Sequence, residues 1–157
     1  MNLKNKNVGW VFTGSFGTFS KTIEQLKNII KEGANIIPIM SDAAYNSDTK
    51  FGNSKKYIEE IKNIVGTEEI IHSMEEVEAL GCKGLTDTIV IAPATGNTIA
   101  KLANGITDSI ATLAIKSHLR DSSKPVVIGI STTDALSTNA ENIRKTFEQE
   151  KLLFYTI

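Results

Sequence analysis

Short apolar runs alternate with segments of helical periodicity along this chain. The first run, Val8–Thr13, is apolar on both faces, which is typical of a central strand in a parallel sheet. Pro38 lies within the second run and predicts a lightly paired position, because proline has no backbone N–H to give to a ladder. We interpret as strands the segments 8–13, 35–40, 69–72, 88–92, 125–130 and 152–155.

Apolar side chains spaced three and four residues apart predict helices between these strands. Gly33 and Gly66 each follow such a segment and are expected to end a helix. The signal is weakest around Met74, where it indicates a helical turn. The predicted helices are residues 19–30, 57–65, 74–80, a segment that opens around Thr107–Asp108, and residues 140–147.

This alternation predicts an α/β fold in which a single doubly wound parallel sheet has helices on both faces. We expect six strands in the order 3-2-1-4-5-6 of a Rossmann-like flavoprotein fold. A chain of 157 residues suits one domain, and it stops after the sixth predicted strand without a helix to cover that strand. We therefore expect one domain over residues 1–157 that lacks a C-terminal extension.

The loop after the fourth predicted strand carries the strongest functional signal. In open α/β sheets, ligands bind beyond the carboxyl ends of the strands, where loop amides and helix N-termini hold anionic groups. Pro93 is expected to end strand pairing, and Gly96 lets the backbone approach a ligand closely. Thr95, Asn97 and Thr98 offer hydroxyl and amide groups to a ring or a phosphate. A polar loop that only caps its own helix explains the same residues equally well.

Two further loops are predicted at the same edge of the sheet. After the first strand, Gly14, Ser15 and Thr18 precede a helix and suit a phosphate, although the Gly-Lys-Ser/Thr of a P-loop is absent. After the fifth strand, Asp134 and Asn139 accompany several hydroxyl side chains and can line a polar pocket. Asn139 serves equally well as the N-cap of the last helix. We expect the three loops to converge into one receptacle for a planar or phosphorylated compound.

A longer polar loop, residues 41–53, follows the second strand and is expected to be functional or mobile. Asp42 stands where an acidic residue binds a ribose hydroxyl in NAD-binding folds, and an exposed turn aspartate is the alternative. An NAD(P)-binding domain therefore stays open as a hypothesis.

Charge and side-chain chemistry exclude several classes of function. The net charge of −1, without a basic run among aromatic residues, argues against nucleic-acid binding. Cys82 is the only cysteine, which excludes an internal disulfide and a cysteine-rich metal site. His72 and His118 lie at no spacing that indicates catalysis or a metal site, so no metal is expected. Lys101, six residues after Thr95, is either a phosphate contact or, as we favour, a solvated surface lysine. The chain has neither a membrane-length apolar stretch nor a signal peptide, and a cytoplasmic protein is expected.

Several motifs resemble a known family. The segment Ala92–Asp108 is similar to the Pro-Ala-Ser-Ala-Asn-Thr signature of the flavoproteins that include the peptidyl-cysteine and phosphopantothenoylcysteine decarboxylases and the prenyl-FMN-forming enzymes. Within that family, Phe12–Ser15, Lys50–Gly52 and Gly129–Leu136 resemble the B subunits of dipicolinate synthases. The similarity extends over nearly the whole chain.

The resemblance implies a homo-oligomer with an FMN cofactor. It implies an oxidoreductase subunit that acts in the mother cell during sporulation, beside an A subunit that resembles nicotinamide-dependent dehydrogenases and carries NAD(P). Together the two subunits would oxidise a small dicarboxylate, a dihydrodipicolinate-type precursor, to dipicolinate. The flavin or phosphate contacts that it implies are Gly14, Ser15, Ser41, Pro93, Ala94, Thr95 and Asn97.

Two departures from the decarboxylases argue against cysteine decarboxylation. Residues 41–53 contain no histidine, although the decarboxylases use one in this region. Ser131–Asp134 replaces their Pro-Ala-Met-Asn-type substrate motif.

The leading hypothesis is therefore a dipicolinate synthase subunit in which Ser15, Thr95 and Asn97 orient the ligand. Asp134 is the candidate proton-handling group, because a carboxylate beside a departing proton can act as a base. The alternative is a non-catalytic flavin- or nucleotide-binding subunit that completes its partner.

Overall fold

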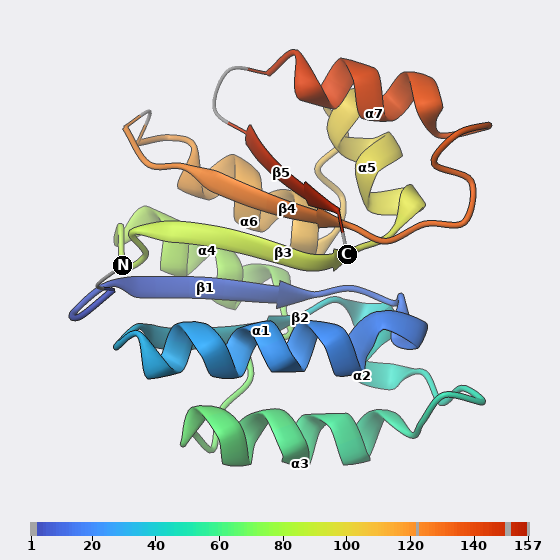
Figure 1. Cartoon of the computed structure of the whole chain (residues 1–157). Helices are drawn as coiled ribbons and strands as arrows, with labels where there is room; N and C mark the ends of the chain where they lie inside the picture. Colours follow the sequence, from blue (N-terminus) through green and yellow to red (C-terminus); the bar gives the residue numbers. More distant parts are fainter. Residues whose placement is uncertain (1–2, 122, 150–151, 157) are drawn as a thin grey trace.

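A five-stranded parallel sheet forms the centre of the molecule, with helices on both faces (Figure 1). Residues 3–121, 123–149 and 152–156 are described in the computed structural model. The strands are β1 (Asn7–Phe12), β2 (Asn35–Met40), β3 (Thr88–Ala94), β4 (Val126–Ile130) and β5 (Leu152–Thr156). The helices are α1 (Phe19–Lys31), α2 (Asp42–Asn46), α3 (Ser54–Val65), α4 (Met74–Cys82), α5 (Gly96–Ala103), α6 (Ile110–His118) and α7 (Ala140–Phe147), and a 3-10 turn, η1 (Phe16–Thr18), precedes α1.

The strands lie in the order β2-β1-β3-β4-β5, and neighbouring strands are parallel. The predicted α/β class is confirmed, whereas the predicted sheet of six strands in the order 3-2-1-4-5-6 is wrong. Residues 69–72, which were expected to form its third strand, contribute only an isolated bridge between Ile71 and Ile39 of β2. Removal of that strand from the predicted order leaves the observed one.

Pro38 explains why this edge strand does not form. The N–H of Ile71 donates to the Pro38 carbonyl oxygen at 3.0 Å, and the N–H of Met40 donates to the Ile71 carbonyl oxygen at 2.8 Å. The next bond of a parallel ladder requires the N–H of residue 38, which proline lacks. On its other side Pro38 keeps its place opposite Trp10 of β1. The predicted light pairing at Pro38 is thus confirmed, and it limits the edge to a single bridge.

Strand β3 continues past its predicted end at Ala92. Pairing with β4 shifts register between Ile91 and Ala94, so Pro93 displaces the ladder without ending it. The Ala92–Pro93 peptide bond is cis. The prediction that Pro93 ends strand pairing is wrong, because the carbonyl of Ala94 beyond it still accepts a hydrogen bond from the N–H of Ser131, at 2.9 Å.

The segments after β2 and β3 contain more helix than the sequence indicates. Helix α5 begins directly after Thr95, within the predicted polar loop, because the Thr95 hydroxyl caps its first turn. Helix α6 begins at Ile110, near the predicted start at Thr107–Asp108. Helix α2 lies inside the predicted loop 41–53, and Ser41 caps it. Short helices of small polar residues lack the apolar periodicity that reveals longer ones.

The other predicted helices are confirmed as α1, α3, α4 and α7. Gly66 follows α3 with a φ of 75°, the left-handed conformation that glycine adopts most readily. None of the helices in the described part of the chain combines the length and the apolar character that a membrane span requires. Helix α1, for example, has only 13 residues.

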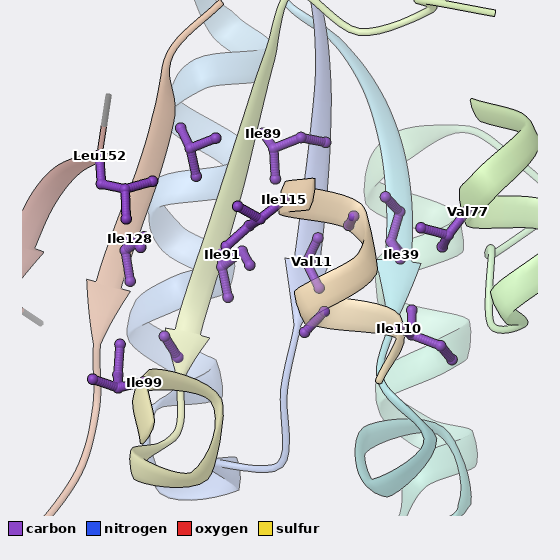
Figure 2. Close-up of a cluster of buried hydrophobic side chains, with 14 of the residues drawn as sticks. Val11, Ile39, Val77, Ile89, Ile91, Ile99, Ile110, Ile115, Ile128 and Leu152 are labelled. Carbon is purple, nitrogen blue, oxygen red and sulfur yellow. The ribbon is translucent and has the colours of Figure 1, made fainter. Parts of the chain in front are cut away.

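Each face of the sheet has its own apolar cluster. Helices α1 and α3 pack on one face, against Trp10 and Phe12 of β1. Helices α4, α5 and α6 pack on the other face, where Val11 of β1 lies. Figure 2 shows this second cluster, in which Ile115 of α6 lies close to Ile91 of β3. Alternate residues of a strand point to opposite faces, so one strand supplies both clusters.

Helices α4 and α6 approach each other very closely at Gly81 and Ser117. A Cβ added at Gly81 would lie 2.3 Å from the Ser117 Cβ and 3.1 Å from the Ser117 carbonyl carbon. Neither of these atoms is the end of a flexible side chain. Glycine at position 81 is therefore what allows the two helices to pack at this distance.

Gly81→Ala should lower the free energy of unfolding by about 1–3 kcal/mol, because the added methyl group overpacks this contact. Urea denaturation of the two proteins measures the difference. The double variant Gly81→Ala/Ser117→Gly removes the opposing Cβ and should recover part of the loss. Equal stability of Gly81→Ala and wild type would contradict the close packing.

His118 is buried between the amino ends of β3 and β4. Its Nε2 donates to the Pro125 carbonyl oxygen at 3.1 Å, and its Nδ1 lies 2.9 Å from the Thr86 hydroxyl, which donates to it in the neutral ring. Desolvation by burial lowers the pKa of His118 below its usual range. The folded protein therefore keeps this ring neutral, at the edge of the sheet opposite the candidate loops.

A depressed histidine pKa makes folding depend on pH. The unfolded chain binds a proton at His118 at a higher pH than the folded chain does, so stability is complete above about pH 6.5 and declines below it. Denaturation at several values between about pH 7.5 and 5.5 should show a slope of up to roughly 1.4 kcal/mol per pH unit. His118→Gln should flatten this slope, whereas the matched variant His72→Gln should retain it.

Candidate functional site

The loops after β1, β3 and β4 converge at the carboxyl edge of the sheet, as the sequence predicts. The buried Thr13 hydroxyl donates to the Pro93 carbonyl oxygen at 2.6 Å and accepts a hydrogen bond from the Thr95 N–H at 3.1 Å. The hydroxyls of Ser15 and Ser131 lie 2.8 Å apart. Residues far apart in the sequence thus form one polar surface.

Three hydroxyls gather at the centre of this surface. The Ser131 hydroxyl lies 2.8 Å from that of Ser15 and 2.9 Å from that of Thr18, and the Thr18 hydroxyl also donates to the Ser15 carbonyl oxygen at 3.0 Å. A hydroxyl rotates, donates one hydrogen bond and accepts others. This hydroxyl cluster (Ser15, Thr18 and Ser131) can therefore redirect its donors to oxygen atoms of a ligand.

A cleft of about 970 Å³ opens beside the hydroxyl cluster. This volume lies within the usual range of small-molecule and cofactor sites. Apolar side chains, among them Phe16, Phe51 and Ile130, combine with hydroxyls and backbone in its walls. The lining consists of residues 14–18 after β1, 49–51 after β2, 130–133 and 135–136 after β4, and Ile143 and Phe147 of α7.

Two of the predicted cofactor-binding residues, Gly14 and Ser15, line the cleft directly. Two others are helix caps. The Ser41 hydroxyl accepts a hydrogen bond from the Ala44 N–H at 3.2 Å, and the Thr95 hydroxyl accepts one from the Thr98 N–H, also at 3.2 Å. The capping role that was open for the loop after β3 is thus present in the structure.

The remaining four predicted residues lie in β3 and in the first turn of α5. Pro93 and Ala94 are buried in the strand. The Thr98 hydroxyl is buried and lies 3.0 Å from the Thr95 hydroxyl. Asn97 is exposed, and its side-chain amide makes no hydrogen bond within the described part of the chain. Asn97 is the member of this group with donors available to a ligand, and its binding role stays a prediction.

Asp134 fastens the loop after β4 to itself. One carboxylate oxygen accepts a hydrogen bond from the Thr132 hydroxyl at 2.5 Å, and the other accepts one from the Asn139 side-chain amide at 2.8 Å. These two bonds hold the pKa of Asp134 below its usual range. A lower pKa makes the carboxylate a weaker base, and both of its oxygens are already engaged. Its proton-handling role stays a prediction.

Gly96 is the point where α5 meets this loop. A Cβ there would lie 2.6 Å from the Asn139 amide nitrogen and 2.8 Å from the Thr132 hydroxyl oxygen. The predicted close approach at Gly96 is therefore made by the protein's own loop, which occupies the space beside this glycine.

Two walls of the cleft were not predicted as such: Lys50–Gly52 was identified only as a family motif within the polar loop 41–53, and α7 only as a helix. One is the segment 49–51, where Lys50 and Phe51 extend over the first loop; the other is the apolar side of α7, with Ile143 and Phe147. The available sequence signal for the first wall was Phe51, a large apolar residue within a polar loop. Nothing in the spacing of α7 distinguishes its cleft side from a core side.

The histidines and the cysteine lie away from the cleft lining. His72 stacks on Tyr45 with ring centroids 4.0 Å apart, and Cys82 accepts a hydrogen bond from Arg120 on the exposed side of α4. Among the described residues, no three His, Cys, Asp or Glu side chains come together as a metal ion requires.

The sequence profile of the flavoprotein family matches residues 1–146. The chain is 37% identical over 153 residues to the B subunit of dipicolinate synthase from Bacillus subtilis, a match that covers 98% of this chain and 76% of that protein. The similarity thus extends along nearly the entire sequence.

Solved structures give the same result. The crystal structure of the dipicolinate synthase B subunit from Bacillus halodurans matches with a TM-score of 0.85 and 40% identity, over 98% of this chain and 78% of the other. The structure of Burkholderia xenovorans DmrB in complex with FMN matches with a TM-score of 0.74 and 20% identity, over 98% and 89% of the two chains. The second likeness establishes a shared fold only.

Gly96→Ala tests how tightly the loops converge. The added methyl group displaces the Asn139 amide or the Thr132 hydroxyl, each the end of a side chain that donates to Asp134, so the free energy of unfolding should fall by about 1 kcal/mol, the value of one hydrogen bond. Gly17→Ala is the matched control, because its Cβ would meet only ordinary contacts, 3.7–3.9 Å from the Phe51 ring. Its effect should stay within about 0.5 kcal/mol. Similar urea midpoints for Gly96→Ala and wild type would rule out the contact.

Proposed function

This chain belongs to the flavoprotein family and is a homologue of the B subunit of dipicolinate synthase, and from that premise we propose that it performs the same role in a dipicolinate synthase. With a dehydrogenase-like partner, the A subunit of that enzyme, it converts a dihydrodipicolinate-type precursor to dipicolinate during sporulation. The observation that carries this proposal is the cleft at the carboxyl edge of the sheet, where hydroxyl donors, apolar walls and one cation meet.

The balance of charge in the cleft favours an anionic ligand. Of its described lining residues, Lys50 alone has an ionisable side chain, and no carboxylate lines the cleft. The hydroxyl cluster supplies further donors. Aromatic and aliphatic side chains of the walls, such as Phe16 and Phe51, suit the faces of a flat ring. A ring that carries carboxylates meets all three conditions.

The reaction removes two electrons and two protons from the ring of the precursor. The oxidised nicotinamide of the dehydrogenase-like partner would accept a hydride from a ring carbon, and a proton would leave a second ring atom for a base or for water. In this scheme the present chain binds the carboxylates, sets the plane of the ring and keeps water from its faces. Correct orientation alone accounts for a large share of many enzymatic accelerations.

The residues of the cleft also fit FMN. The hydroxyl cluster and Lys50 match a phosphate, because a phosphate accepts hydrogen bonds and pairs with a cation. The apolar walls match a flavin ring. Bound FMN would supply reversible two-electron chemistry at this site. Ser15 and Gly14, which line the cleft, are the residues that we assign to its phosphate.

For the proton we assign Asp134, which lies in the loop after β4. Its two hydrogen bonds, from Thr132 and Asn139, stabilise the ionised form. Each carboxylate oxygen keeps a second lone pair, at which it can take a proton while these hydrogen bonds stay in place.

A second function is favoured by the chemistry that the cleft lacks. Because its described lining holds no acid, histidine or thiol, the chain can serve as a non-catalytic component that binds a ligand and completes the dehydrogenase-like partner. The two functions differ in one measurable way. If the chain takes part in catalysis, the turnover rate changes when a ligand-binding residue is altered, whereas a purely structural role affects only assembly.

Reconstitution with the dehydrogenase-like partner tests the proposal. Dipicolinate formation and nicotinamide reduction should require both proteins, and Ser15→Ala, which removes a hydroxyl from the cleft lining, should lower the rate at least about tenfold, the value of one hydrogen bond to a charged group. Ser20→Ala, at an exposed position of α1, is the matched control. Full turnover by the dehydrogenase-like partner on its own would defeat the catalytic proposal.

The absorption spectrum of the purified complex tests the cofactor assignment. A flavin band, or a change in protein stability when FMN is added, is the expected result. Neither a band nor a response to FMN would remove FMN from the proposal and leave the dicarboxylate as the ligand.

A further inference from the structure

The segment between β2 and α3 folds into a small hairpin, residues 48–53, whose tip extends over the cleft. Backbone hydrogen bonds join Thr49 and Gly52 in both directions, at 3.0 and 3.1 Å. The Thr49 hydroxyl accepts a further bond from the Phe51 N–H at 3.2 Å. We name residues Lys50 and Phe51 the hairpin tip.

Side chains at the base of the hairpin hold it in place. The Asp48 carboxylate accepts hydrogen bonds from the Ser54 N–H at 2.9 Å and from the Asn53 amide at 2.8 Å. The Tyr57 hydroxyl donates to the Phe51 carbonyl oxygen at 2.8 Å. These bonds fix the backbone of the hairpin tip before any ligand arrives, which reduces the entropy lost on binding.

Phe51 reaches the first loop of the site. Its ring would be 3.7–3.9 Å from a Cβ at Gly17, so it lies directly over that backbone. The side chain is nevertheless 57% exposed, although it is large and apolar. An aromatic ring that is held by its backbone and left open on a cleft is suited to contact a second ring.

Among the residues that the structure describes, Lys50 has no acidic partner. Its ammonium lies 5.1 Å from the centroid of the Phe51 ring, and within the described part of the chain it forms no ion pair. Other lysines of this protein do pair, as Lys101 does with Asp108 at 2.7 Å. Lys50 therefore places an uncompensated positive charge at the mouth of a cleft whose described lining contains no carboxylate.

We propose that the hairpin tip determines which ligands the cleft accepts: the Lys50 ammonium binds an anionic group, and the Phe51 ring packs against the flat ring that bears it. The inference rests on the proposed function in taking this cleft as the ligand site. The anionic group is a carboxylate of a pyridine-type substrate or the phosphate of a flavin nucleotide. A neutral analogue of either ligand has no anionic group for Lys50 to bind.

Calorimetric titration with two matched pairs of probes tests the proposal. Dipicolinate is compared with pyridine-2,6-dicarboxamide, and FMN with riboflavin, so each pair differs in its anionic group. In wild type at least one anionic probe should bind more tightly than its neutral partner. Lys50→Met should weaken that probe about tenfold, within the value of a hydrogen bond to a charged group at an exposed site, and leave the neutral partner unchanged.

Further variants test separately the charge of Lys50, its position in the cleft and the ring of Phe51. Lys50→Arg keeps the charge and should stay within about threefold of wild type. Lys56→Met removes a charge from an exposed position of α3 outside the cleft and should bind as wild type does. Phe51→Leu should weaken the charged and neutral members of a pair alike, since both use the ring contact. Thermal unfolding confirms that each variant is folded.

The pair whose discrimination depends on Lys50 identifies the source of the anion. Dependence of dipicolinate alone indicates the substrate carboxylate, and dependence of FMN alone indicates the phosphate. The proposal is overturned if Lys50→Met binds both anionic probes as wild type does, if Lys56→Met weakens them equally, or if wild type binds none of the four probes.

Failure of this inference can be told apart from failure of the proposed function. Lys50-dependent binding without dipicolinate formation by the two reconstituted proteins would retain the role of the hairpin tip and reject the synthase. Dipicolinate formation with an unaltered rate and affinity in Lys50→Met would do the reverse.

Discussion

The hydroxyl of Thr13 connects the parts of this protein that matter for its site. It donates to the backbone of Pro93 and accepts from the backbone of Thr95, so the end of β1 is fastened to the end of β3 and to the cap of α5. Because this hydroxyl is buried, loss of either hydrogen bond would leave a polar group without a partner inside the protein, which is costly. The two bonds therefore hold these segments in one arrangement. The first loop, and with it Ser15, is therefore fixed relative to α5. The position of the hydroxyl cluster follows from this one side chain.

Close approach of neighbouring segments is the second constraint, and two glycines provide it. Gly81 lets α4 and α6 pack at the back of the sheet, while Gly96 lets the loop after β4 rest on α5. That loop then uses Asp134 to bind its own residues, with the result that its wall of the cleft keeps a defined shape. Polar side chains here serve mostly to hold loops, and fewer of them are available to a ligand than their number suggests.

Much of the fold followed from the sequence, and the exceptions have physical causes. Alternation of apolar runs and helical periodicity predicted the parallel sheet and its carboxyl-edge site. The predicted edge strand at residues 69–72 was wrong because Pro38 lacks the backbone N–H that the next hydrogen bond of the ladder requires. Only the register of β2 shows that this N–H would face residues 69–72. The cap role of Thr95 was one of two equal interpretations, since a capping hydroxyl and a ligand-binding hydroxyl look alike in sequence. The hairpin tip was missed as a wall because its placement depends on contacts of Asp48 and Tyr57.

Pro38 also affects how copies of the chain interact with one another. An exposed edge of a sheet is a template on which a foreign strand can add. Beside β2, such a strand would meet the single bridge of Ile71 and, next to it, Pro38, which has no backbone N–H to donate. Addition of a foreign strand is thereby discouraged along β2, which is one of the two edges of the sheet.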